Sequence, residues 1–514
     1  MLNYSYKQSV KNMVRHTILK KAVDMLTVNR STACCVRNSY VRDLYDYFVC
    51  LKETHESNEA KKIDLSYIRE WERIHMNSIG NKRPDELSVC YLSGPEPEND
   101  FQELVNLGVL PQNIWAFENE KNTYLRALGS LDTSSYMQPK IIKASIERFF
   151  ENTPKTFDIV YIDACASLIS DQHALRCVSS LFQHHRLNSP GILITNFACF
   201  DVNNSIEKAQ YVDLISRYNH IKSNRKFGVR NDSGKIVLSD DIEETYKKTE
   251  DHLKDAYGDF ITAMICNAAS VTIPVLRFCN STYLNTLSTT TPINGYKFTV
   301  ENVNQIKDNT VFKYFASNEL LQPFDTNYLG VDRINKLSKE LSGSFQIEKF
   351  LPSLKKVNDI KTDTVNLPEE LKEVIHFFDK SKKLYQFLDK PNRVLFIDSV
   401  INQLSYPMHY VAHKSLRLSY TAKTKQMFTD LILFDECRYI YDWIPAIHQI
   451  VKAFSNKSWQ YTFRFGLDGL VKQRINYNNE FFFQGSVISK VIPNFEAKHF
   501  PERLLVREEI DYEY

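Results

Sequence analysis

The segment LSVCYLSGPEPEND (87–100) opens a stretch, running to Phe200, in which five short apolar runs are separated by helix-length intervals. Each run ends in a small or polar residue or is followed by one. The four later runs share this form: NIWAF (113–117), KIIKA (140–144), FDIVYID (157–163) and GILITN (191–196). Strands alternating with helices are typical of a mainly parallel sheet with both faces covered. The stretch therefore predicts an α/β fold, with ligands bound beyond the carboxyl ends of the strands.

Composition narrows the function class. The chain has 514 residues, a formal charge of +2 and 25% charged residues, so any binding of nucleic acid needs a local patch. The ten cysteines form no CxxC pair, which indicates reduced thiols and suggests no metal site. The N-terminus lacks an apolar signal core. The longest apolar run (261–276) is interrupted by Asn267 and Pro274, so we expect a cytoplasmic protein without a membrane span.

We expect three regions: N-terminal helices over 1–84, a sheet domain over 85–300 and a C-terminal α+β recognition or interaction domain over 301–514. Arg15, Lys20 and Lys21 make the N-terminal region locally basic, which fits a lid, a nucleic-acid-facing arm or an ordinary solvated helix face. In the C-terminal region, the pattern predicts a helical pair over 424–454 and a hairpin over 460–492. The run 261–276 is expected to give a helix and a further strand.

The loop after the first apolar run carries an unusual ligand-binding signal. It reads Ser93-Gly94-Pro95-Glu96-Pro97, with one glycine and two prolines that remove amide donors. With Glu98 it is acidic, so it suits a cationic or sulfonium ligand better than a pyrophosphate.

Glu118 comes directly after the second run, at a strand end where a carboxylate can accept hydrogen bonds from the two ribose hydroxyls of an adenosine. The alternative is an acidic residue that favours the start of the next helix.

Three further runs end in candidate site residues. Ser145 and Ile146 follow the third run, where a polar and an apolar side chain could contact adenine. Asp163 ends the fourth run and could bind substrate or act as a base, or it could cap the following helix. Asn196 ends the fifth run and is expected to line the same crevice.

The order of these features resembles the class I, Rossmann-fold S-adenosylmethionine-dependent methyltransferases. The similarity is carried by the acidic first loop, Glu118, the pattern FDxVxxD over 157–163 and the pattern GxLxxN over 191–196. It covers roughly residues 85–200. The resemblance implies a seven-stranded sheet whose last strands fall within 260–300. It also implies S-adenosylmethionine held by the first loop, with Glu118 on its ribose. We therefore expect cofactor contacts from Ser93, Gly94, Glu96, Glu118, Ser145 and Ile146, and we expect Asp163 and Asn196, from their places at strand ends, to be the catalytic residues.

The sequence also departs from this family. Ser93 stands where the family has an acidic residue, and Gly94 is a single glycine in a loop that is usually glycine-rich. The family members that methylate the amino groups of adenine and cytosine have an Asp/Asn-Pro-Pro-aromatic motif after the fourth strand, and the chain has Asp163-Ala164-Cys165-Ala166. Two functions remain open: a methyltransferase, most plausibly for nucleic acid, or an inactive methyltransferase-fold scaffold or sensor in a multiprotein assembly. A Rossmann enzyme that uses another nucleotide is a third reading.

The segment HYVAHKSLRLSYTAKTK (409–425) interleaves basic and aromatic residues, a pattern that can track a phosphate backbone and stack bases. Its candidate nucleic-acid contacts are Lys414, Arg417, Lys423 and Lys425. The alternative is an exposed basic helix or hairpin beside a domain interface. Protein partners are expected for the scaffold reading.

Overall fold

The computed structural model describes most of the chain. The described residues are 9–132, 140–164, 166–168, 174–226, 242–281, 369–380, 386–390, 395–422, 424–478, 487–488, 492–500 and 507–510. The candidate contact Lys423 and nearly all of the segment 280–365 lie outside them.

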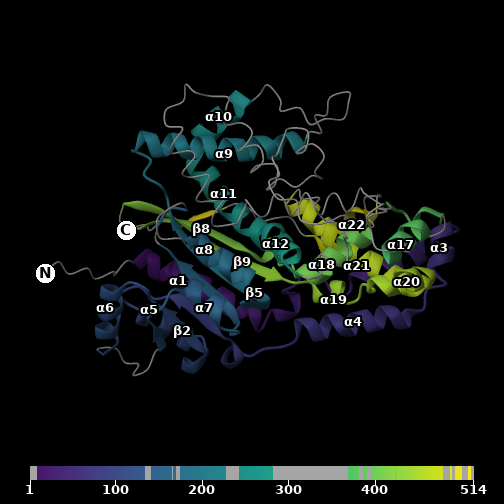
Figure 1. The fold of residues 1–514 in the computed structure, drawn as a ribbon, viewed down its shortest axis with the longest axis horizontal. Helices are drawn as coiled ribbons and strands as arrows, with labels where there is room; N and C mark the ends of the chain where they lie inside the picture. The colour runs from purple at the N-terminus through teal and green to yellow at the C-terminus, as the bar shows by residue number, and fades with distance from the viewer. Residues whose placement is uncertain are drawn as a thin grey trace.

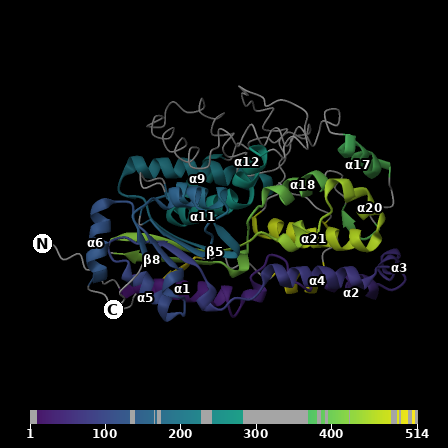
Figure 2. The same ribbon diagram turned by 60° about the horizontal axis from the view of Figure 1, so that its bottom comes forward.

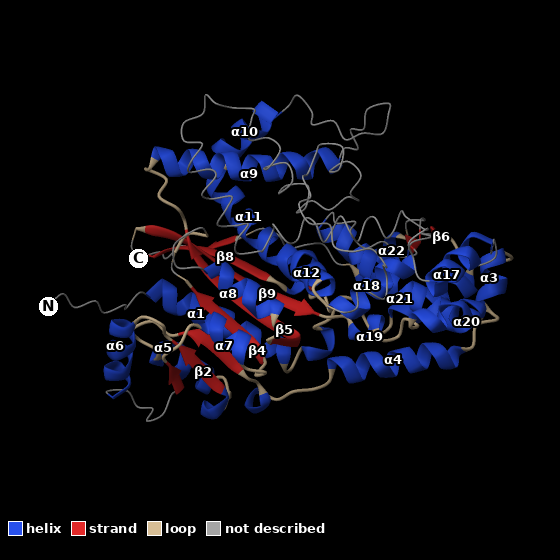
Figure 3. Ribbon diagram, in the orientation of Figure 1, coloured by secondary structure: helices blue, strands red, loops and turns tan. Residues whose placement is uncertain are grey.

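The five strands expected between 87 and 200 are all present. They are β1 (Val89–Leu92), β2 (Ile114–Phe117), β3 (Lys140–Ile142), β4 (Phe157–Asp163) and β5 (Leu187–Ala198). All pair in parallel, in the order β3-β2-β1-β4-β5. β4 is buried over most of its length, which explains why its sequence is a nearly continuous apolar run rather than an alternating one. The expected α/β fold is confirmed (Figure 3).

The remaining strands of the sheet come from much later in the chain. They are β7 (His409–Tyr410), β8 (Leu416–Ala422), β9 (Lys425–Asp435) and β11 (Glu508–Ile510). β9 runs antiparallel to β5, β8 is antiparallel to β9, and β11 adds in parallel at the edge. The expectation of a seven-stranded sheet whose last strands lie within 260–300 is wrong: the sheet has nine strands in the described residues, and those beyond β5 all come from after residue 400.

The helix expected at the start of 424–454 is strand β9 instead. Its residues from Met427 to Asp435 are all buried, and a fully buried strand has no alternating pattern that distinguishes it from a buried helix.

Helices cover both faces of the sheet (Figure 2). One face carries α1 (Ser9–Leu26) and α5 (Glu98–Asn106). The opposite face carries α11 (Leu253–Asn267) and α12 (Ile273–Cys279), together with α8 (Ala174–Gln183), which packs on α12, and α7 (Ile146–Asn152), which packs on α8. Gly258 of α11 permits a close approach to β9, because a Cβ there would lie 2.9 Å from the Phe428 ring. The helices α6 (Lys121–Asp132), α9 (Ser205–Lys226) and α10 (Ile242–Asp251) complete this part of the chain.

The run 261–276 forms no strand. It belongs to a continuous helical segment, Leu253–Cys279, in which the π-helical turn η4 (Ala268–Thr272) joins α11 to α12. Among the described residues this segment alone is long and apolar enough to cross a membrane, by length and composition. Its most apolar window is 83% buried inside the fold, as in a core helix. The apolar character is thus accounted for by packing against the sheet.

A helical lobe lies beside the sheet and is built from both ends of the chain (Figure 1). Its N-terminal members are α2 (Tyr40–Cys50), α3 (His55–Ala60) and α4 (Leu65–Ile79). Its C-terminal members are α17 (Glu369–Lys380), α18 (Leu395–Ser405), α19 (Arg438–Tyr441), α20 (Ile450–Ser455), α21 (Lys457–Asn478) and α22 (Pro493–His499), with the small sheet of β6 (Asp389–Lys390) and β10 (Val487–Ile488). Short 3₁₀ turns are η1 (Arg30–Thr32), η2 (Pro84–Glu86), η3 (Pro111–Asn113), η7 (Ala412–Lys414) and η8 (Ile447–Gln449).

The hairpin expected over 460–492 is wrong for its first half, which is helix α21. The alternation of aromatic and polar residues suggested a strand with one solvated face, yet Tyr461 to Gln473 are all buried. The polar residues have buried partners: Arg464 forms an ion pair with Asp389, and Asp468 accepts from the Ile488 amide at 2.7 Å. Because these polar residues are buried with hydrogen-bonding partners, their alternation with aromatic residues does not mark a solvent-exposed strand face.

Candidate functional site

The carboxyl ends of the parallel strands gather the residues that the sequence singles out. Leu92 of β1 is in register with Phe117 of β2, so Ser93 and Glu118 follow at the same edge of the sheet. Asp163 of β4 is in register with Asn196 of β5 at that edge. We call the region beyond these strand ends, where the sequence predicts ligand binding, the carboxyl-edge crevice. Its position is the one expected for a ligand site in an open α/β sheet.

The first loop turns sharply at Gly94. Its φ of +58° lies in the left-handed region that favours glycine. Ser93 is buried, and its amide donates to the Phe117 carbonyl at 3.0 Å, which fixes the loop to β2. Glu96 Oε2 accepts from Asn99 Nδ2 at 3.1 Å, so this carboxylate is partly used in holding the start of α5.

Glu98 offers an acceptor that the sequence did not single out as a site residue. Its Oε1 accepts from Ser130 Oγ at 2.6 Å, whereas Oε2 is buried and has no hydrogen-bond partner among the described residues. A buried acceptor without a partner is costly, and a ligand that carries a donor or a positive charge would satisfy it. This oxygen fits the cationic ligand that the acidic loop predicts.

Glu118 is half-buried at the end of β2. Its amide donates to the Ile142 carbonyl at 3.1 Å, and its Oε1 accepts from the Glu120 amide at 2.8 Å. The carboxylate thus orients the turn into α6 and keeps a half-exposed position at the crevice, which is compatible with both readings of this residue.

The residues expected to contact adenine differ in accessibility. Ser145 is half-buried at the N-terminus of α7, with Oγ 3.4 Å from Glu147 Oε2. Ile146 is 2% exposed and packs in the core cluster, so in this state it presents almost no surface to a ligand.

Asp163 and Asn196 form one hydrogen-bonded network. Asn196 is fully buried, and its Nδ2 donates to Asp163 Oδ1 at 2.8 Å and lies 3.2 Å from the Tyr420 hydroxyl. Its Oδ1 accepts from Thr429 Oγ1 at 2.8 Å. Asn196 therefore stands behind Asp163 and orients it, rather than facing the crevice as expected.

Helix α1 supplies one cation to this network, Lys11, and a second, Arg15, to Asp100 of α5. Lys11 Nζ lies 2.9 Å from Asp163 Oδ2, and Arg15 Nε donates to Asp100 Oδ1 at 2.7 Å. Burial acts to lower the pKa of Arg15, but the attraction of Asp100 outweighs it and the pKa is raised. Burial raises the pKa of Asp100, and Arg15 opposes that rise. The start of α1 thus lies against the carboxyl end of β4.

The sequence could not identify Lys11, Arg15 and Asp100 as partners. The paired residues are 85 or more positions apart in the chain, so no local sequence pattern predicts the pairs. The basic character of α1 was the signal available.

The basic residues of 409–425 do not form one surface. Arg417 is buried and pairs with Asp259 Oδ1 at 2.5 Å and with Asp430 Oδ1 at 3.9 Å. Its charge is therefore balanced by these carboxylates and is not presented to a nucleic acid. Lys425 is exposed at the hairpin that joins β8 to β9, beside the carboxyl edge. Lys414 precedes β8 and lies at the opposite edge. The segment is divided because a strand separates its ends by roughly 20 Å or more.

Within the described residues, one group of side chains is close enough to share a metal ion: Cys35, Asp435 and Cys437, all buried. Asp435 ends β9 at the edge opposite the crevice. Its Oδ2 accepts from the Cys35 amide at 2.9 Å and from the Tyr439 hydroxyl at 2.7 Å. Its Oδ1 accepts from the Cys437 amide at 2.8 Å. These bonds account for the buried carboxylate without an ion.

Comparison with known proteins gave similarity in structure alone. No protein-family model and no curated protein matches the sequence. A solved S-adenosylmethionine-dependent methyltransferase from Clostridium acetobutylicum ATCC 824 is 12% identical, with 31% of this chain and 57% of that chain covered and a TM-score of 0.18. A Staphylococcus aureus protein assigned as a caffeoyl-CoA O-methyltransferase is 16% identical, with 42% and 87% covered and a TM-score of 0.17.

The chain thus spans just over half the length of the first of these proteins. At such TM-scores the superpositions carry no argument, and the strand order of the sheet is the evidence for the fold. The resemblance to the class I, Rossmann-fold S-adenosylmethionine-dependent methyltransferases is limited to a segment of this chain.

Proposed function

We propose that the carboxyl-edge crevice binds S-adenosylmethionine and that the chain transfers its methyl group to a nucleic-acid acceptor. The observation that carries the proposal is the set of carboxylates around the crevice, from the loop after β1, the end of β2 and the end of β4. One of their oxygens, Glu98 Oε2, is buried without a partner among the described residues. A sulfonium ligand with a ribose and an ammonium group matches this acidic, acceptor-rich lining.

In the proposed reaction the bound cofactor supplies an electrophilic methyl group. Glu118 accepts from the ribose hydroxyls, and Glu98 Oε2 faces the positive part of the ligand. Asp163, held in place by Asn196, receives the acceptor's N–H or O–H at Oδ2, where the Lys11 ammonium now lies 2.9 Å away. The carboxylate orients the acceptor and takes its proton, and alignment of the reacting groups provides most of the rate gain.

Nucleic acid as the acceptor is supported by one exposed cation at the crevice, Lys425, on a hairpin that pairs with the end of β5. Ala198 is in register with Met427, and the Cys199 amide donates to the Gln426 carbonyl at 2.7 Å. A phosphate contact at this position would place the nucleotide beside the strand ends.

An inactive methyltransferase-fold scaffold is the second candidate, and a specific observation favours it. Lys11 occupies the open oxygen of Asp163, and Asn196 is fully engaged inside the protein. Because the Asp163 carboxylate already has a cationic partner within the chain, the folded protein does not need a bound cofactor to balance that charge.

Calorimetry with S-adenosylmethionine tests the cofactor assignment. We expect saturable binding that Glu118→Gln weakens by roughly 10-fold, since a charged hydrogen bond is lost. The matched control is Glu151→Gln, at an exposed position near the end of α7. Absence of binding at millimolar ligand, or binding indifferent to Glu118, overturns the proposal. A labelled-methyl assay on cellular RNA and DNA then separates the enzyme from the scaffold.

A further inference from the structure

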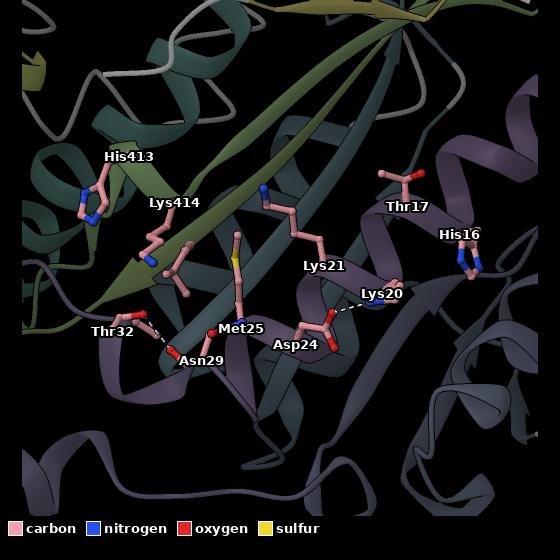
Figure 4. Close-up of a pocket in the computed structure, with 12 residues that line it drawn as sticks. His16, Thr17, Lys20, Lys21, Asp24, Met25, Asn29, Thr32, His413 and Lys414 are labelled. Atoms are coloured by element: carbon pink, nitrogen blue, oxygen red, sulfur yellow. Dashed lines mark hydrogen bonds and ion pairs between the residues drawn. The ribbon is translucent and has the colours of Figure 1, made fainter. Parts of the chain in front are cut away.

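A pocket lies beside the C-terminal half of α1 (Figure 4). It has a volume of about 570 Å³ and is bounded by the second half of α1, the segment around η1, the turn η7 and strand β9. Cavities of a few hundred to about 1,000 Å³ are the size that binds small molecules. The proposed function does not use this pocket.

The pocket is separate from the carboxyl-edge crevice. Lys11 reaches the crevice from the first turn of α1, and Lys21 reaches the pocket ten residues later, roughly 15 Å along the helix axis. Leu433, which lines the pocket, is in register with Ile192, four residues before Asn196 on β5. The two sites therefore lie toward opposite edges of the same sheet.

Positive charge dominates the pocket lining. Lys20, Lys21 and Lys414 face it with one carboxylate, Asp24, which pairs with Lys20 at 2.7 Å. No ion pair of Lys21 or Lys414 is found within the described part of the chain. Figure 4 shows these two side chains approaching the same space from opposite walls. Two ammonium groups without an ion-pair partner make a favourable place for a dianion.

The pKa of His413, which also lines the pocket, is lowered in part by nearby positive charges. Burial, Lys414 and Arg37 together lower its pKa to about 4, so the imidazole is neutral near pH 7. A neutral imidazole can add a hydrogen bond without further charge.

The floor of the pocket is apolar. Met25 lies between the two lysines in Figure 4, whereas Ala33 and Leu433, at 1% and 0% exposed, also line the pocket but offer a ligand almost no surface. Met25 is 6% exposed, and a flexible thioether suits contact with a flat or irregular ligand surface. A ligand here would thus need both an anionic group and an apolar part.

We propose that this pocket binds a small phosphate-bearing ligand of nucleotide size, with its phosphate between Lys21 and Lys414 and its apolar part over Met25. The phosphate bridges two segments nearly 400 residues apart in the sequence, α1 and η7. Both were singled out as locally basic, and the fold brings their charges to one cavity.

The test is a calorimetric titration of the full chain with adenosine monophosphate, and a second titration uses inorganic phosphate. We expect saturable binding of adenosine monophosphate that the double variant Lys21→Gln/Lys414→Gln weakens by roughly 10-fold or more. Asp24→Asn should strengthen binding about 3-fold, because it removes the one carboxylate and releases Lys20. Lys52→Gln, at an exposed lysine outside the pocket, is the matched control and should change nothing.

Glu118→Gln distinguishes this site from the crevice, since an adenosine ligand could enter either. Binding lost in Glu118→Gln and retained in the lysine double variant would overturn the pocket proposal. Absence of saturable binding at about 10 mM of either probe would also overturn it. A single-stranded oligonucleotide that binds through these lysines while adenosine monophosphate fails to compete would assign the pocket to a phosphate backbone and reject the small ligand. Circular dichroism of each variant checks that the fold is intact.

Discussion

Lys11 Nζ lies 2.9 Å from Asp163 Oδ2, which ties the first turn of α1 to the carboxyl end of β4. The side chains are 16% and 12% exposed, so the pair is shielded more than an ordinary surface ion pair. Lys11→Met should lower the free energy of unfolding by about 1 kcal/mol, because it leaves Asp163 with reduced compensation. A double-mutant cycle with Asp163→Asn, measured by urea unfolding, should give a coupling of 0.5 kcal/mol or more, roughly. Strict additivity would show that the contact contributes nothing.

Asp435 joins the η1 region to the end of β9 through a buried carboxylate. Asp435→Ala should cost about 3 kcal/mol or more in unfolding free energy, since the Cys35 and Cys437 amides lose their buried acceptor. Tyr439→Phe removes a single hydrogen bond, of 2.7 Å, and should cost about 1 kcal/mol. Chemical denaturation of the two variants compares them, and equal losses would contradict the central role of the carboxylate.

Glu59 should make the free energy of unfolding depend on pH below about 4.5. Hydrogen bonds from Lys457 and Lys62 lower its pKa to about 2, below the ordinary value of 4.5. The folded protein thus binds this proton less readily than the unfolded chain, and the stabilisation is present above pH 4.5 and lost as the pH falls toward 2. Because both lysines are about half exposed, solvent screening reduces the effect to about 1 kcal/mol. Glu59→Gln should be less stable than wild type at pH 7, and the difference should shrink below pH 4.5.

His413 gives a second pH dependence of known sign. Its pKa of about 4 lies below the ordinary 6.5, so between these values the unfolded chain binds a proton that the folded protein does not. Stability should therefore fall as the pH drops from 6.5 to 4, by about 1–2 kcal/mol from this residue. His413→Gln should reduce the slope of unfolding free energy against pH in this window. His499, whose pKa is also lowered to about 4, keeps part of the slope in the variant. An unchanged slope in His413→Gln would contradict the assignment.

Lys425 and Arg417 should behave differently toward nucleic acid. Lys425→Gln should weaken binding of single-stranded RNA or DNA and reduce the slope of log affinity against log salt by about 1, as expected for one phosphate contact. Arg417→Met should leave that slope unchanged and lower thermal stability instead, because Arg417 is buried between Asp259 and Asp430. Fluorescence anisotropy over a salt series measures the slope. Identical slopes for wild type and Lys425→Gln would remove the nucleic-acid contact from the proposal.

Apolar runs in the sequence predicted strands correctly where the strand is buried inside the sheet. The run FDIVYID gives β4 because five of its seven residues are apolar and the strand lies inside the sheet, between β1 and β5. Its first acidic residue, Asp158, is fully buried and accepts from the Ser88 amide at 2.9 Å, whereas Asp163 ends the strand near Lys11. Both are aspartates of one motif, and only their three-dimensional surroundings separate a structural carboxylate from a candidate site residue.

Short apolar runs separated by helix-length intervals can be read from the chain alone, and they predicted the five parallel strands and the edge at which Glu118 and Asp163 lie. The tertiary structure decided the rest. It completed the sheet with β8 and β9 from more than 200 residues later, and it placed Lys11 on Asp163. It also divided the basic segment 409–425 between a buried ion pair, the crevice and the lysine pocket. These features depend on contacts between distant segments, and such contacts leave no periodicity in the chain.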